Sequence, residues 1–209
     1  MTDHPSTKLP ADKRHRLFQI ASGEFAAKGF TQASLNHIIS QMRMSKSSFY
    51  HYFSNKSDLF TQTFLYAAAP VFELSYSLAE EAKTADQVWP ALESLTMRLV
   101  PIVHAAPLVI TAGRMFYRSR EDSAGKPLTE ELLAQFSAWI TTQLQYGQSL
   151  GAFRSDLPDS LLISLIMALG MSLDQWILEQ WDVLEDAEKM RFSAAGFDLL
   201  KRMLAPTST

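Results

Sequence analysis

The stretch from residue 20 to residue 60 constrains the fold of this chain more than any other part of the sequence. Three short helical patterns follow one another there, and tight connections join them. Gly29 ends the first pattern, because glycine tolerates the left-handed conformation that often follows a helix. Ser34 and Ser45 precede the second and third patterns, and a serine hydroxyl at such a position accepts a backbone N–H of the first helical turn. The sequence therefore predicts three helices, up to residue 28, from residue 35 and over residues 46–53.

The second and third of these helices form a helix-turn-helix pattern. Leu35, Ile38, Ile39 and Met42 have the i, i+3, i+4, i+7 spacing of an amphipathic helix. In a helix-turn-helix motif the second helix enters the major groove of DNA. Residues 46–52 suit that role, because they combine Lys and Ser, which reach phosphates or base edges, with three consecutive aromatic side chains that end in polar groups.

Roughly residues 12–60 resemble the N-terminal DNA-binding domain of the tetracycline-repressor (TetR) family of regulators. The most specific part is the string SFYHYFSNKSDLF, residues 48–60. The matching residues are Ile20, Ala21, Phe25, Gly29, Phe30, Ser34, Ile38, Ser45, Lys46, Phe49, Tyr50, Tyr52, Phe53, Lys56 and Leu59. The family usually has glycine in the turn between the second and third helices, where this chain has Arg43. A non-glycine residue with positive φ costs about 1 kcal/mol.

The motif and the resemblance together predict which side chains contact DNA. The side chains expected to contact base edges are those of Lys46, Ser47, Ser48, Tyr50 and His51. The side chains expected to contact phosphates are those of Ser34, Tyr50, Tyr52 and Lys56. Asn55 is expected to cap the helix that begins at Lys56.

Charge is distributed unevenly along the chain. The 209 residues have a formal net charge of −3, yet residues 1–60 hold eight Lys and Arg against four Asp and Glu, an excess of four positive charges. A basic N-terminal part on an acidic body is expected when only one end of a protein meets DNA. No cysteine is present, which excludes disulfides and thiol chemistry. No basic-then-apolar leader and no run of about 18 apolar residues occurs, so we expect a cytoplasmic protein with no membrane partner.

The signatures of enzymes are missing from the sequence. No two of the five histidines have the i, i+4 spacing of a helical metal pair. Neither a nucleophile elbow nor a glycine-rich phosphate-binding loop occurs. We therefore expect no enzymatic activity, no metal and no cofactor.

The rest of the chain is predicted to be helical, giving an all-α fold of about nine helices. Residues 1–11 lack an apolar period and are expected to form a flexible arm. A kink or break is expected near Ala69, before Pro70, and another break containing His104 between Pro101 and Pro107. Further helices are expected over residues 56–83, 84–100, 108–120, 127–150, 160–180 and 185–204, with Asp156 or Asp159 capping the helix from residue 160. The predicted domains are an arm and helix-turn-helix domain, 1–55, and a helical ligand-binding and dimerisation domain, 56–209.

Large apolar side chains of the body, with a few polar ones, have the composition of a small-molecule site. The candidate pocket residues are Trp89, Met97, His104, Phe116, Trp139, Gln143, Met167 and Met171. For any one of them, filling the core is the ordinary role.

The helix predicted over residues 160–180 is apolar on nearly every face, so it is expected to be buried on most faces. One side can face the chain's own core and another a second protomer. TetR-family proteins dimerise through the helix that corresponds to this one together with the last helix, which is predicted here over residues 185–204. The resemblance thus implies a dimer interface at Leu169, Gly170, Leu173, Trp176, Ala195 and Leu199.

The main hypothesis from the sequence is a homodimeric repressor that a small apolar ligand releases from a near-palindromic operator. A ligand-independent architectural DNA-binding protein is one alternative, and it predicts a body without a cavity. A helical carrier or interaction protein that no longer reads DNA is the other, and the basic N-terminal part disfavours it.

Overall fold

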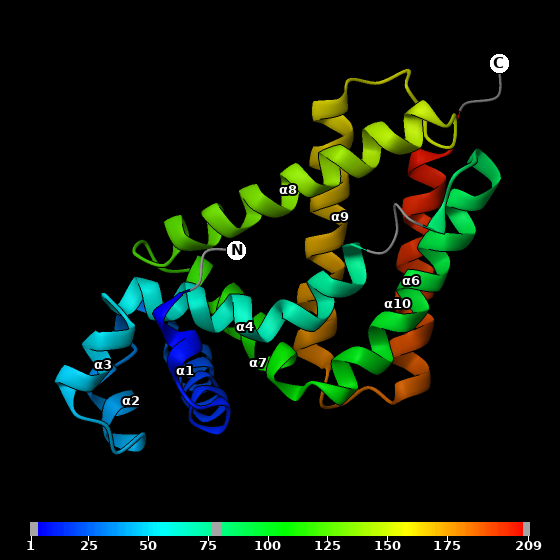
Figure 1. The fold of residues 1–209 in the computed structure, drawn as a ribbon. Helices are drawn as coiled ribbons and strands as arrows, with labels where there is room; N and C mark the ends of the chain where they lie inside the picture. The colour runs from blue at the N-terminus through cyan, green and yellow to red at the C-terminus, as the bar shows by residue number, and fades with distance from the viewer. Residues whose placement is uncertain (1–3, 77–80, 207–209) are drawn as a thin grey trace. The chain divides into compact units, whose positions relative to one another are not determined.

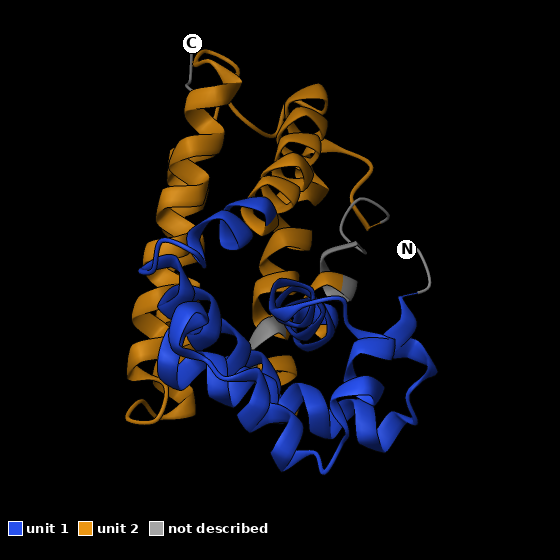
Figure 2. Cartoon of the chain, turned by 90° about the vertical axis from the view of Figure 1, so that its left-hand side faces the viewer, with its two compact units in different colours: residues 1–69, 106–131 blue, residues 70–105, 132–209 orange. Residues whose placement is uncertain are grey.

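The computed structural model describes residues 4–76 and 81–206 (Figure 1). These residues form nine α-helices and one short 3-10 helix, and no strand occurs among them, so the predicted all-α fold is confirmed. The chain divides into two compact units (Figure 2). Unit 1 comprises Met1–Ala69 and Ala106–Glu131, and unit 2 comprises Pro70–Ala105 and Leu132–Thr209.

Two helices, α4 (Lys56–Tyr76) and α8 (Lys126–Ser149), run from one unit into the other. Unit 1 otherwise contains η1 (Pro5–Lys8), α1 (Ala11–Gln32), α2 (Leu35–Gln41), α3 (Lys46–Tyr52) and α7 (Pro107–Arg120). Unit 2 otherwise contains α6 (Ala85–Ala105), α9 (Asp159–Gln180) and α10 (Asp186–Leu204).

The core of unit 1 is aromatic. Phe25, Phe49 and Phe60 are fully buried, and the Phe25 ring meets the edge of Phe60 with centroids 5.2 Å apart. Helix α7 packs along α1. Leu17 and Ile38 also belong to this core, because neither side chain is exposed. Burial of these large side chains holds α1, α2, α3 and the start of α4 in one bundle.

The first predicted helix ends where the sequence indicated. Gly29 has φ 71° and ψ 174°, so the regular helix stops there, and α1 continues as one further turn to Gln32. A Cβ on Gly29 would lie 3.3 Å from the Asp122 carboxylate, so both the backbone and the neighbouring side chain favour glycine.

Of the kink or break predicted near Ala69, a break is excluded and the kink stays a prediction, and the break predicted around His104 lies instead at Ala106. Helix α4 runs through Pro70, and α6 runs through Pro101 to Ala105. A proline inside a helix lacks an N–H donor and its ring crowds the carbonyl four residues earlier, which can bend a helix without ending it. The chain does break before Pro107, because Ala106 adopts φ −126° and ψ 74° and α7 then begins at the proline.

Two further predictions are wrong, namely the flexible arm at the N-terminus and the aspartate cap of α9. The expected flexible arm is folded from residue 4 onward, with η1 in place and both Ser6 and Leu9 buried; residues 1–3 lie outside the described part. Helix α9 begins after Pro158 without a side-chain cap. Asp156 instead pairs with Arg154, with 2.7 Å between Oδ2 and Nη2.

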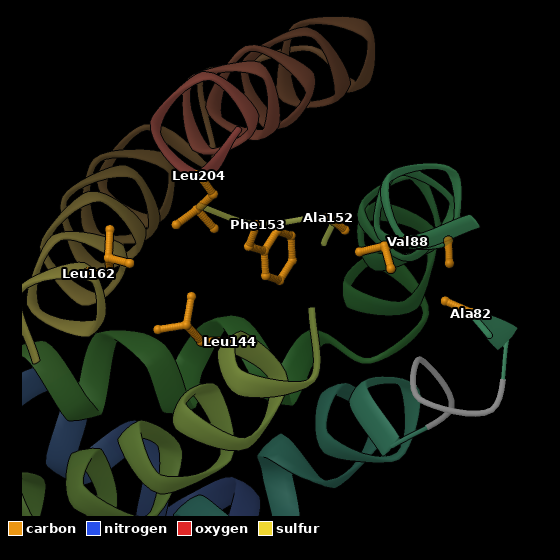
Figure 3. Packing of buried hydrophobic residues seen from close by; sticks show 8 residues of the cluster. Ala82, Val88, Leu144, Ala152, Phe153, Leu162 and Leu204 are labelled. Atoms are coloured by element: carbon orange, nitrogen blue, oxygen red, sulfur yellow. The ribbon is translucent and has the colours of Figure 1, made fainter. Parts of the chain in front are cut away.

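The core of unit 2 gathers side chains from α6, α8, α9 and α10 around Phe153, which lies between Leu204 and Val88 in Figure 3. A Cβ on Gly147 of α8 would lie 2.1 Å from the Phe153 ring. Glycine at this position therefore lets α8 pack directly against the ring.

Candidate nucleic-acid interface

The helix-turn-helix is built by local hydrogen bonds that the sequence predicted. Ser34 Oγ accepts the His37 N–H at 3.3 Å, and Ser45 Oγ accepts the Ser48 N–H at 3.1 Å. These bonds satisfy backbone donors in the first turns of α2 and α3. Asn55 Oδ1 accepts the Asp58 N–H at 2.9 Å, so the predicted cap of α4 is also present.

Arg43 occupies the turn between α2 and α3 with a positive φ of 51°. Its N–H donates to the carbonyl of Ser40 at 2.9 Å, and the Met44 N–H donates to Ile39 at 3.1 Å. This pair of bonds is a Schellman motif, which places one residue in the left-handed region after a helix. The turn thus has the left-handed conformation that glycine adopts easily, and this chain has arginine at the position where the TetR family usually has glycine.

The recognition helix α3 has a buried face and an exposed face. Phe49 is fully buried and stacks on Phe53, with centroids 5.3 Å apart. Four of the predicted base-facing side chains are exposed, among them Tyr50 at 55%; the others are Lys46, Ser47 and His51. Ser48 is half-buried. Helical spacing places residues 46, 47, 50 and 51 on one side, opposite the core.

The charge around α3 favours a polyanionic partner. Residues 25–57 contain no Asp or Glu and four cations, Lys28, Arg43, Lys46 and Lys56. An uninterrupted positive stretch attracts phosphates, because neutralisation of the DNA backbone supplies much of the binding free energy. The exposed polar face of α3 lies within this stretch.

Lys56, predicted to contact phosphate, is held within the protein. Its ammonium donates to the carbonyls of Thr31 and Ala33, at 3.1 Å each, and lies 4.8 Å from the centroid of the Phe30 ring. An ammonium has three N–H donors, so one remains after these two bonds. Lys56 therefore fixes the corner between α1 and α2, and its contact with phosphate stays a prediction.

Two carboxylates hold the same corner, and neither of them is predicted to have a role there. Glu24, 8% exposed, accepts the Ser34 N–H at 3.0 Å and the Lys28 ammonium at 2.8 Å. Asp122 accepts the Thr31 N–H at 2.7 Å and the Ala124 N–H at 3.0 Å. The Asp-x-x-Gly pattern of residues 122–125 is a local signal of an aspartate that caps its own turn. Its bond to Thr31, 91 residues away, has no local signal.

The pKa of both carboxyl groups is lowered by these bonds. Burial by itself raises the pKa of Glu24, but hydrogen bonds from Lys28 and the Ser34 N–H outweigh it and hold the pKa below its ordinary 4.5. For Asp122, burial acts in the same upward direction, and the N–H groups of Thr31 and Gly125 bring the pKa below its ordinary 3.8. Both side chains are therefore stabilised as carboxylates.

We expect unit 1 to lose stability in acid through these two groups. A lowered folded-state pKa stabilises the fold above the ordinary pKa, and this contribution disappears as the pH falls through the folded-state value. The midpoint of thermal unfolding should therefore drop as the pH is lowered from about 5 to about 3. In Glu24→Gln the drop should be smaller, whereas Glu179→Gln, an exposed control, should follow the wild type. An equal drop in all three proteins would contradict the assignment to Glu24.

The predicted pocket residues take several different environments. Phe116 packs against Phe64 in unit 1, with centroids 5.4 Å apart. In unit 2, Trp89 donates to the Ala152 carbonyl at 3.3 Å and contacts Phe153. Met97 is 36% exposed. Trp139 stacks on another aromatic ring, Met167 and Met171 are half-buried, and the side chain of His104 lies outside the described part.

A small apolar cavity lies in unit 2, and one predicted residue, Gln143, lines it. Its volume is about 30 Å³, and its walls include Val88, Leu92 and Phe153. The hydroxyl of Tyr146, which also lines the cavity, donates to the Ala82 carbonyl. Ligand sites usually have volumes of about 300–1,000 Å³. The cavity is therefore the size of one or two small atoms rather than of an effector.

Helices α9 and α10 leave apolar surface uncovered within the chain. Trp176 is 42% exposed and Leu199 is 54% exposed, and Gly170 has open space around it. Of the other residues predicted at a dimer interface, Ala195 is exposed and Leu169 and Leu173 are half-buried. Leu173 also fills the space that a Cβ on Gly196 of α10 would occupy, at 2.1 Å. By length and composition alone α9 is apolar enough to cross a membrane, a test that core helices also pass.

The geometry defines a helix-turn-helix protein with a helical body, and comparisons identify its relatives. Residues 18–63 match the family of bacterial regulatory proteins, tetR family. No curated protein matches the chain.

Solved structures share the fold over nearly the whole chain. The fatty acid degradation regulator FadR from Bacillus halodurans superimposes with a TM-score of 0.70 at 16% identity, covering 90% of this chain and 97% of that one. FadR from Bacillus subtilis, solved with stearoyl-CoA, gives 0.68 at 15% identity and covers 89% and 96%. A TetR-family regulator from Agrobacterium tumefaciens gives 0.64 at 16% identity and covers 94% and 100%.

Residues 18–63 therefore match the tetR family of bacterial regulatory proteins, and the chain has the all-helical fold of solved TetR-family regulators. The predicted resemblance is thus confirmed.

Proposed function

We propose that this protein is a homodimeric transcriptional repressor that a small apolar molecule releases from its operator. The exposed face of α3 carries the proposal, because it lies in a stretch of 33 residues, 25–57, without an acidic side chain. In this proposal residues 1–55 read DNA, and residues 56–209 bind the effector and dimerise. The protein then acts in the cytoplasm, where bacterial DNA lies, and has no enzymatic role.

Recognition would place the N-terminal half of α3 in the major groove. Lys46, Ser47 and Ser48 would reach base edges from the first turn, with Tyr50 and His51 one turn further along. Phosphates would be contacted by Ser34, Tyr50, Tyr52 and the remaining donor of Lys56. Phosphate contacts fix the register, and the base contacts supply the sequence preference.

A dimer through α9 and α10 would present two copies of α3 to one face of the duplex. The exposed Trp176 and Leu199 support this interface, since large exposed apolar side chains on adjacent helices favour association. A two-fold symmetric dimer reads two half-sites about one helical turn apart, so the operator should be near-palindromic.

The effector would enter unit 2 by enlarging the cavity beside Gln143 and Tyr146. The apolar walls there suit a hydrocarbon group, and the amide and hydroxyl would orient a polar end. The complex of Bacillus subtilis FadR with stearoyl-CoA supports an effector with a long apolar part. Release of DNA requires only that the effector bind the non-operator conformation more tightly.

Selection from a random DNA pool tests both halves of this proposal. We expect the full-length protein to enrich one near-palindromic sequence, and a long-chain acyl thioester to lower retention of that sequence at least about tenfold. A short-chain acyl thioester with the same head group is the matched control and should have no effect. Enrichment of no sequence would reject the DNA-reading role.

The small cavity favours a second candidate function, a DNA-binding protein that needs no effector. With about 30 Å³ of space, the core of unit 2 is nearly filled. In this case the selection from random DNA enriches the same operator, but no apolar molecule reduces the amount of operator that the protein retains. Thermal unfolding of unit 2 should then be unchanged by long-chain acyl thioesters, whereas a bound effector raises the midpoint.

A further inference from the structure

Residues 4–9, named here the N-terminal strap, are docked on the corner that follows the recognition helix. We propose that the N-terminal strap positions α3 for DNA reading, with His4 and Asp58 as the positioning residues. The inference rests on the proposed DNA-binding function and adds to it two side chains that need not touch DNA.

A hydrogen bond between distant parts of the sequence ties the N-terminal strap to α4. His4 Nε2 lies 3.0 Å from Asp58 Oδ1, although 54 positions separate the two residues. The other ring nitrogen, Nδ1, accepts the Ser6 N–H at 3.1 Å. A carboxylate can only accept a hydrogen bond, so Nε2–H is the donor to Asp58. Both ring nitrogens are therefore used.

Two buried side chains anchor the N-terminal strap within unit 1. Ser6 is 3% exposed and Leu9 is 5% exposed. The Leu9 N–H donates to the Ser6 carbonyl at 3.1 Å, and the Thr7 N–H donates to the His4 carbonyl at 2.9 Å. The backbone is thus folded by its own bonds, and two buried side chains anchor it.

Asp58 links the N-terminal strap to the backbone that follows α3. While Oδ1 receives His4, Oδ2 accepts the Ser54 N–H at 2.8 Å and the Ser54 hydroxyl at 3.0 Å. Ser54 is the second residue after α3 ends at Tyr52. One carboxylate therefore joins the N-terminal strap, the end of α3 and the first turn of α4.

A ring contact provides a second route to α3. The His4 ring lies 5.6 Å from the Phe53 ring, and Phe53 stacks on Phe49, the buried anchor of α3. Helix α3 has seven residues, and so short a helix has little stability or fixed direction by itself. Its orientation depends on the groups that hold its ends, and the N-terminal strap holds the C-terminal end.

Orientation matters for base contacts more than for phosphate contacts. Base edges are read by bonds of defined geometry, whereas the attraction to random DNA depends on the number of cations. Removal of the His4 ring leaves every Lys and Arg of the chain in place. We therefore expect it to weaken binding to the operator and to leave binding to random DNA nearly unchanged.

The test compares full-length His4→Ala and Lys8→Ala on the selected operator and on random DNA. We expect His4→Ala to lower operator affinity about tenfold, the value of a hydrogen bond to a charged group, with random-DNA affinity within about twofold of wild type. His4→Gln, whose amide can donate to Asp58, should restore most of the loss. Lys8 is an exposed cation on the same strap, so Lys8→Ala shows what the loss of a phosphate contact would look like. Loss of such a contact lowers the affinity for both DNAs alike and lowers the salt slope by about one.

Hydrogen exchange gives a readout that does not depend on DNA. In His4→Ala the amides of Phe53 and Ser54 should exchange at least about fivefold faster, while the Ile140 amide in α8 should keep its wild-type rate. Wild-type operator affinity in a folded His4→Ala, equal losses on both DNAs, or unchanged exchange at Phe53 and Ser54 would each overturn the inference. If the wild type prefers no sequence, the proposed function fails, and the exchange rates still decide whether His4 fixes the end of α3.

Discussion

The double substitution Lys46→Ala with Tyr50→Ala is expected to lower operator affinity by about a hundredfold, because each lost contact to DNA is worth about 1–3 kcal/mol. Both side chains are exposed on α3, and alanine is the best helix former, so the fold should be retained. Fluorescence anisotropy with labelled operator at one stated salt concentration measures the effect.

Lys126→Ala is the matched control for charge. Lys126 is exposed in the first turn of α8 and pairs only loosely with Glu130, at 3.8 Å. We expect its operator affinity to stay within about twofold of wild type. If the double variant and the control bind equally well, the exposed face of α3 is not the DNA-reading surface.

The second large effect is expected at the surface of α10. Leu199→Glu should convert the dimer to a monomer, because two-fold symmetry places the new charge twice in an apolar interface and like charges in contact cost several kcal/mol. The substituted side chain is 54% exposed within the chain, and Leu and Glu have similar helix propensities, so the protomer should fold. Sedimentation velocity should show the monomer, and operator affinity should fall at least about a hundredfold, since one half-site alone remains bound.

Val183→Glu serves as the control for this experiment. Val183 is 79% exposed in the connection between α9 and α10, so the substitution adds the same charge outside both helices. It should leave the dimer intact. A Leu199→Glu protein that sediments as a dimer would mean that the copies meet elsewhere or that the wild type is not dimeric.

Local signals predicted the DNA-binding module well. Ser34, Ser45 and Asn55 cap the helices that they precede, and Gly29 ends the regular part of α1. Such features depend on residues within four positions of one another, which a sequence displays directly. The side chains predicted to face base edges are likewise neighbours within one short helix, and four of the five are exposed.

Features that depend on distant contacts were not predictable in the same way. Residues 4–9 have the composition of a flexible arm, and they are docked by burial of Ser6 and Leu9 and by the contact between His4 and the distant Asp58. Asp122 joins Thr31 across 91 positions. The pocket residues were chosen by side-chain type, and type does not reveal which face of a helix meets a cavity. Of these residues, Gln143 lines the small cavity in unit 2.

Dimethyl sulfate protection of the selected operator tests the central claim most directly, because the reagent methylates guanine N7 in the major groove. We expect two groups of protected guanines whose centres lie about 10 base pairs apart, on one face of the duplex. The same groups should lose protection in the Lys46→Ala, Tyr50→Ala variant. Full methylation of every guanine N7 in DNA that the wild-type protein occupies would show that α3 does not enter the major groove.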